Sequence, residues 1–202
     1  MDVDEQQLLR TVTRVANTLH AHGIRFAVAG GCAVYAHGGP ASEHDVDIFL
    51  KENDAIPARN ALVASGLRAV DPPEDWLTKA YDGDCLVDLI FRPNQRDVTD
   101  EMLDDAVELR IGPTCAAVMS ATSVVIDKLQ VLDPHRCDFT PLLPIVRALR
   151  EQVDWRRVAK ETGDSPYARA FLRLAADLDV IGAECLARIP AHPKGAADAR
   201  AS

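Results

Sequence analysis

Residues 26–50 combine a glycine pair with two closely spaced aspartates, in the sequence FAVAGGCAVYAHGGPASEHDVDIFL. The first four residues are apolar or small and are typical of a short buried strand, which Gly30 and Gly31 end. Glycine has no Cβ, so backbone N–H groups can approach phosphate oxygens closely. A helical turn over residues 32–37 would add the positive end of its dipole. This part of the chain therefore predicts a phosphate-binding turn.

Two aspartates follow in the apolar stretch 45–50, which is typical of a strand. Because side chains alternate along a strand, Asp45 and Asp47 point to the same face. Two carboxylates there repel each other unless a cation lies between them, and Mg²⁺ takes carboxylate and phosphate oxygens as ligands. Asp88 lies in a second strand-like run, 85–91, where an aspartate in the middle of a core strand also needs a reason. The sequence thus predicts a metal site beside the phosphate-binding turn.

Each feature also has an ordinary structural explanation. A Gly-Gly pair is more often only a turn, and an Asp-x-Asp pair is usually a solvated strand end. Their order along the chain favours the functional interpretation, since strand, glycine pair, short helix, Asp-x-Asp strand and a later Asp-bearing strand form one composite pattern. The pattern predicts a site for a metal and a nucleotide.

The pattern resembles the signature of the nucleotidyltransferase superfamily, which includes DNA polymerase beta, the CCA-adding enzymes and the aminoglycoside nucleotidyltransferases. Residues 29–31, a gap over 32–44, and residues 45–48 match it. The resemblance implies that Asp45 and Asp47 ligate two Mg²⁺ ions, with a nucleoside triphosphate (NTP) as substrate. It also implies that Asp88 is the third carboxylate, which ligates one metal and helps to deprotonate the attacking hydroxyl.

A later part of the chain resembles the AbiEii and MenT type of toxin nucleotidyltransferases, on residues 120–129 and 136–139. The resemblance would make Lys128 a triphosphate ligand and Asp138 a positioning residue. It further implies the tRNA 3′ end as acceptor and an antitoxin protein as partner. Without the resemblance, a solvated helix lysine and a helix-capping aspartate explain the two residues equally well.

The chain departs from the toxin pattern just before the first aspartate. Ala41 and Glu43 stand where toxins of this type often have an arginine and a serine or threonine. Ser42 substitutes only in part, so the departure affects the triphosphate contacts and leaves the metal chemistry intact. We expect Gly30, Gly31 and Ser42 to hold the β- and γ-phosphates, and Lys128 to neutralise charge on the leaving group.

Several acceptors stay open at this point. Besides the tRNA end, an antibiotic-like small molecule or a protein could receive the nucleotide. A non-catalytic nucleotide-binding module is the alternative of another class, although loss of one acid would be expected there. A basic group of residues over 147–160 could track a phosphate backbone, or it could be a solvated surface with internal acidic partners.

Composition favours a cytoplasmic enzyme. The net charge of −9 argues against coating nucleic acid by bulk electrostatics. No apolar run approaches the ~20 residues of a membrane span, and the acidic N-terminus is unlike a signal peptide. The five cysteines are scattered without a paired motif, which indicates neither a disulfide framework nor a zinc site.

The remaining periodicity predicts an α+β fold, in which helices flank a small mixed sheet and a helical bundle follows. We expect a hairpin of residues 76–80 and 85–91, which would bring Asp88 into the same sheet as the Asp-x-Asp strand. The predicted helices cover residues 5–22, 57–65, 99–107, 120–132, 141–153 and 165–187. The predicted division is a catalytic core over 1–112, a helical domain over 113–189 and a disordered tail over 190–202.

Overall fold

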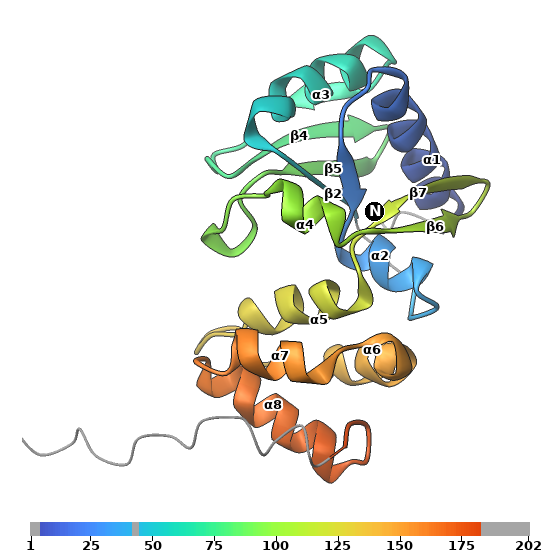
Figure 1. Cartoon of the computed structure of the whole chain (residues 1–202). Coiled ribbons are helices and arrows are strands. Elements are labelled where there is room, and N and C mark those ends of the chain that lie inside the picture. The colour runs from blue at the N-terminus through green and yellow to red at the C-terminus, as the bar shows by residue number, and fades with distance from the viewer. Residues whose placement is uncertain (1–4, 42–44, 183–202) are drawn as a thin grey trace, which may run out of the picture.

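The computed structural model describes residues 5–41 and 45–182 (Figure 1). The expectations for Ser42 and for the tail 190–202 therefore lie outside the described residues. The helix expected over 165–187 ends earlier, at Asp177. No helix of the described part is both long and apolar enough to cross a membrane.

A seven-stranded mixed sheet forms the upper part of the molecule in Figure 1. Its strands lie in the order β3-β4-β5-β2-β1-β7-β6. The strand bounds are β1 Phe26–Val28, β2 Asp45–Leu50, β3 Arg68–Val70, β4 Leu77–Asp82, β5 Cys85–Ile90, β6 Val107–Ile111 and β7 Thr114–Val118. The predicted hairpin is present as β4 and β5, and β5 lies directly beside β2.

Helices α1 (Glu5–Ala21) and α3 (Glu52–Ala64) contact each other and the sheet. Helix α1 buries a stripe of apolar residues at helical spacing, with Val15 and Leu19 fully inaccessible. Helix α2 (Gly30–Ala36) begins directly after β1, and the short helix α4 (Asp100–Asp104) precedes β6. The sheet is therefore held from one face by two long helices, while β1 leads straight into the glycine pair.

The lower part of the molecule is helical (Figure 1). Helix α5 (Ala121–Gln130) contacts α6 (Leu142–Leu149), α7 (Trp155–Thr162) and α8 (Pro166–Asp177), and it also contacts α2. Seven of its ten residues are buried, as expected of a helix enclosed by neighbours. Short 3₁₀ turns, η1 (Pro93–Gln95) and η2 (Arg150–Gln152), complete the fold. Buried apolar residues of the sheet and of these helices belong to one continuous core.

The predicted α+β fold, a mixed sheet with flanking helices and a later helical part, is confirmed. The hairpin of β6 and β7 was not predicted, and the helix expected over 99–107 ends at Asp104. Gly112 and Pro113 form the turn of this hairpin, so the sheet runs on to Val118 and the helices begin at Ala121. The division into two domains stays a prediction.

Candidate active site

The three predicted aspartates lie together on neighbouring strands. Strands β2 and β5 are parallel, with Asp47 directly opposite Asp88. Asp45 is two residues before Asp47 and projects from the same face of β2. One carboxylate oxygen from each of the three lies within 4.8 Å of the others. The period of a strand and one register between two strands are enough to build this cluster.

The electrostatics of the cluster fit a bound cation. Burial and repulsion from Asp45 and Asp88 raise the pKa of Asp47 to about 7. Burial also raises the pKa of Asp88, with a partial offset from Lys79. Lys79 Nζ lies 3.7 Å from Asp88 Oδ1, a buried atom that has no hydrogen-bond partner among the described residues. Crowded carboxylates with an unsatisfied oxygen are the donor set that a hard divalent cation takes.

Gly30 is required by Asp47. Its φ is +54°, and an added Cβ would lie 1.7 Å from Asp47 Oδ2. The backbone N–H of the preceding residue, Ala29, donates to Asp47 O at 2.9 Å, which holds β1 and β2 at this separation. The glycine therefore makes room for an aspartate carboxylate, in addition to the phosphate role that the sequence predicts. Gly31 follows in the first turn of α2.

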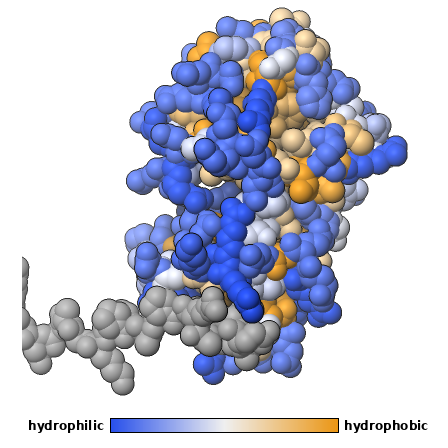
Figure 2. All heavy atoms as spheres, viewed as in Figure 1, coloured by the Kyte–Doolittle hydropathy of each residue, from blue (hydrophilic) through white to orange (hydrophobic). Residues whose placement is uncertain are grey.

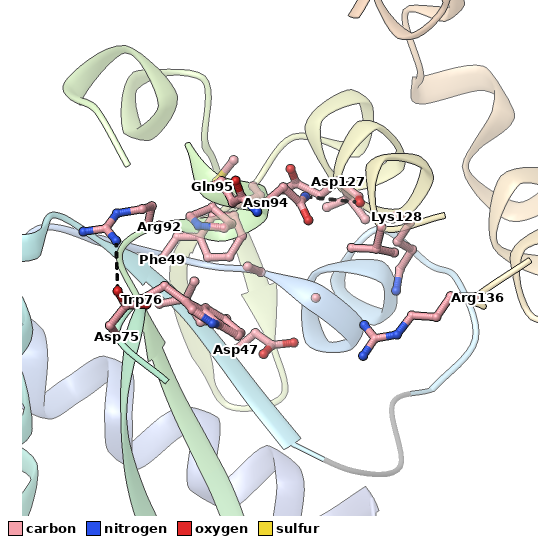
Figure 3. A pocket seen from close by; sticks show the side chains of 17 residues that line it. Asp47, Phe49, Asp75, Trp76, Arg92, Asn94, Gln95, Asp127, Lys128 and Arg136 are labelled. Carbon is pink, nitrogen blue, oxygen red and sulfur yellow. Dashed lines mark hydrogen bonds and ion pairs between the residues drawn. The ribbon is translucent and has the colours of Figure 1, made fainter. Parts of the chain in front are cut away.

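A pocket of about 810 Å³ opens from Gly30 and Asp47 toward α5. Lys128 of α5 lines it, as the sequence predicts for a triphosphate ligand, and so does Arg136. Figure 3 shows both side chains extending into the same part of the pocket. Within the described part of the chain, neither forms an ion pair or a side-chain hydrogen bond. Two cations free to meet an anion thus lie beside the glycine turn.

Not every predicted residue reaches the pocket. Asp138 lies on an exposed loop, where its carboxylate accepts a hydrogen bond from Thr140 N at 2.9 Å, and this bond lowers its pKa. It is not among the residues that line the pocket. Lys79 was not predicted, because only the pairing of β4 with β5 places it opposite Asp88. Arg136 lies in the segment 136–139 that carries the sequence resemblance, but the role there was assigned to Asp138 and none was assigned to Arg136.

The basic group over 147–160 lies away from this pocket. None of its arginines and lysines lines the pocket. Arg157 pairs with Asp105 at 2.9 Å and with Glu161 at 2.8 Å, and Arg150 pairs with Glu151 at 3.0 Å. Internal acidic partners therefore account for part of this charge, which is one of the two interpretations that the sequence leaves open.

Comparison with known sequences adds a family to this geometry. A family model described as a nucleotidyl transferase of unknown function (DUF2204) matches residues 8–166. This match includes the three aspartates, the glycine turn and Lys128. No curated protein matches the sequence significantly.

Solved structures share the fold at low sequence identity. ANT(2")-Ia in complex with adenylyl-2"-tobramycin is 14% identical with a TM-score of 0.57, over 83% of this chain and 98% of that one. An antigenic nucleotidyltransferase-like protein from Paracoccidioides brasiliensis is 18% identical with a TM-score of 0.59, over 93% and 95% of the two chains. The lincosamide antibiotic adenylyltransferase LnuA, with lincomycin bound, is 13% identical with a TM-score of 0.53, over 76% and 100%. At these identities the similarity establishes the fold alone.

Proposed function

Since the chain belongs to this nucleotidyl transferase family of unknown function, we propose that it transfers a nucleoside monophosphate from an NTP to an acceptor hydroxyl. The acceptor oxygen forms a bond to the α-phosphorus, the bond between the α- and β-phosphates breaks, and pyrophosphate leaves. The observation that carries this proposal is the cluster of Asp45, Asp47 and Asp88. Of these, Asp47 lines a pocket that also holds Lys128 and Arg136, two cations without an ion-pair partner among the described residues.

The three aspartates would hold the divalent metal, in the set of two Mg²⁺ ions that the sequence resemblance implies. When bound, these ions supply Lewis-acid stabilisation of the charge that develops on the transferred phosphoryl group. The support in this chain is the crowding of the carboxylates, the raised pKa of Asp47 and the unsatisfied Asp88 Oδ1.

The chain's own groups bind and orient the substrate. Lys128 and Arg136 would neutralise the charge on the leaving pyrophosphate, and backbone N–H groups at Gly30 and Gly31 would hold its oxygens. Asp88 would accept the proton of the attacking hydroxyl at Oδ1, which has no hydrogen-bond partner within residues 5–41 and 45–182. Ser42 is a further proposed phosphate ligand from the sequence. Asp138 would act only indirectly, through the loop that it caps.

The distribution of charge favours a small-molecule acceptor. A nucleic-acid end would be expected to meet a basic rim, but the basic residues over 147–160 do not line the pocket. Adenylyltransferases that act on antibiotics share the fold. The tRNA 3′ end, with an antitoxin as partner, is the competing acceptor that the sequence resemblance implies.

The test is transfer of label from an α-labelled NTP with Mg²⁺ to an acceptor panel. One arm uses total tRNA, and the other uses small polyhydroxylated molecules, including amino sugars. We expect labelled small molecule and free pyrophosphate, both abolished in Asp47→Asn. Asp84→Asn, an exposed acid in the turn between β4 and β5, is the matched control and should keep full activity. Labelled tRNA would replace the small-molecule acceptor, and full activity of Asp47→Asn would overturn the proposed site.

A further inference from the structure

The two ends of the pocket differ in charge. Figure 3 places Lys128 and Arg136 on one side of Asp47, and Trp76, Asp75 and Arg92 on the other. The charges on the second side are paired, because Arg92 lies 3.9 Å from Asp75 Oδ2 and 3.2 Å from Asp97 Oδ1. A ligand that spans the pocket therefore meets free cations at one end, whereas the arginine at the other end is paired with Asp75, Asp97 and Glu52. An NTP has this polarity, with an anionic triphosphate and a neutral base.

The uncharged end presents aromatic and apolar surface. Phe49 and Ile90 lie side by side in the register of β2 and β5, two residues beyond the opposed aspartates and therefore on the same face of the sheet. Both are almost fully buried, and Trp76 beside them keeps 37% of its surface exposed. An exposed tryptophan at a pocket wall can stack on any nucleobase, since every base has a π-face.

Two amide side chains complete this end. Asn94 and Gln95 of η1 both line the pocket, and both have left-handed backbone, with φ of 51° and 60°. Two consecutive non-glycine residues in this region are uncommon, and such strain persists only where the surroundings impose it. Here Phe91 N and Arg92 N each donate to Trp76 O at 3.2 Å, and Arg96 pairs with Asp127 of α5 at 2.9 Å. The turn is thus fixed on both sides, and the tryptophan and the amides are held together.

The amides retain hydrogen-bonding capacity. Asn94 Nδ2 makes one long bond, 3.4 Å, to Asp127 O, which leaves its Oδ1 free among the described residues. The amide of Gln95 has no hydrogen-bond partner in that part of the chain. An amide offers a donor beside an acceptor, the arrangement that pairs with the edge of a base.

We infer that Trp76, Asn94 and Gln95 form the nucleobase subsite, in which the indole stacks on the base and the amides read its edge. This inference rests on the proposed function. It assigns NTP selectivity to a strained turn after β5, a segment in which no sequence pattern predicts a functional residue.

The experiment measures dissociation constants of ATP, GTP, CTP, UTP and tripolyphosphate, with Mg²⁺ and without acceptor, by calorimetry. The variants are Asn94→Gly and Gln95→Gly, since glycine accepts positive φ and removes only the side chain. Asp179→Gly, at another residue with positive φ and outside this pocket, is the matched control. Trp76→Ala tests the stacking.

The wild-type protein should prefer one NTP, and each glycine variant at η1 should reduce that preference about tenfold, the effect of roughly one lost base contact. Trp76→Ala should weaken all four NTPs by about tenfold or more. Tripolyphosphate should bind equally to every variant, and the melting temperatures of the glycine variants should not fall. Asn94→Asp keeps the size, replaces the amide donor with an acceptor and adds a negative charge. It should change the preferred NTP even if a glycine variant folds poorly.

Two results would overturn the inference and leave the proposed function intact. One is unchanged NTP preference in folded variants, and the other is unchanged NTP affinity with a raised KM for the acceptor, which would assign this end to the acceptor. If the wild-type protein bound neither NTPs nor tripolyphosphate, this result would instead contradict the proposed function itself.

Discussion

At the scale of single residues, Asp47 is expected to destabilise the metal-free folded protein, because its carboxylate is positioned to bind a metal. Its carboxylate is surrounded by two others and is buried enough to raise its pKa to about 7. In metal-free buffer at pH 8 the carboxylate must ionise at the expense of folding. We expect Asp47→Asn to raise the free energy of unfolding by about 1–3 kcal/mol in EDTA. Urea unfolding measures this change, with Asp84→Asn as control, and a destabilised Asp47→Asn would show that the carboxylates are not in conflict.

The residues that the sequence predicts and those that it misses differ in what determines their positions. Asp45 and Asp47 share a face because of the period of one strand, and Gly30 is close in the chain, so a local pattern is sufficient for these three. Lys79 comes to Asp88 only through the register of β4 on β5. Register is set by pairing between strands, and a single sequence does not state it.

At the scale of elements, the hairpin of β6 and β7 is the largest feature that the sequence reasoning missed. Residues 107–118 are divided by Gly112 and Pro113, which is a turn signal, but the pattern was interpreted as the boundary between sheet and helices. The burial of β6 is weak, with three of its five residues exposed, so the alternation that marks a half-buried strand is faint there. The position of such an edge strand is determined by its pairing with the neighbouring strand, and its own sequence indicates it only weakly.

The contact between α5 and η1 predicts a dependence on pH. Asp127 of α5 pairs with Arg96, yet burial outweighs this attraction and raises its pKa from 3.8 to about 6. Because the folded protein holds this proton more tightly than the unfolded chain, the contribution of Asp127 to stability falls as the pH rises from about 4 to 6. In Asp127→Asn, the decrease in the free energy of unfolding between about pH 4 and pH 6 should be smaller than in the wild type by up to about 2–3 kcal/mol.

The measurement is urea unfolding of the wild type and of Asp127→Asn between pH 4 and pH 7. Only the difference between the two proteins is attributed to Asp127, since other acids titrate over the same interval. Asp84→Asn should follow the wild-type curve throughout. Equal pH slopes in the wild type and Asp127→Asn would mean that Arg96 keeps the carboxylate ionised in the folded protein.

At the scale of the whole molecule, the pocket joins the sheet to the helices. Its wall includes Asp47 of β2 and Lys128 of α5, and one continuous apolar core extends through both parts. The face in Figure 2 is mostly hydrophilic, and the large exposed apolar side chains of the described residues are spread over several parts of the chain, with Ile56 and Val63 both on α3. We therefore expect the sheet and the helices to be held together by the shared core and, when it is bound, by the NTP in the pocket.

Ligand binding should for this reason stabilise both parts together. At an NTP concentration about 100 times its Kd, with Mg²⁺, the free energy of unfolding should rise by about 2.7 kcal/mol. For a chain of this size that corresponds to an increase in Tm of about 5–10 °C, in a single transition. Calorimetry with and without NTP measures it. Asp47→Asn should give a much smaller shift, because one of the three carboxylates that would hold the metal is then lost. Two separate transitions, with only one of them moved by the NTP, would mean that the sheet and the helices unfold independently and that the pocket does not couple them.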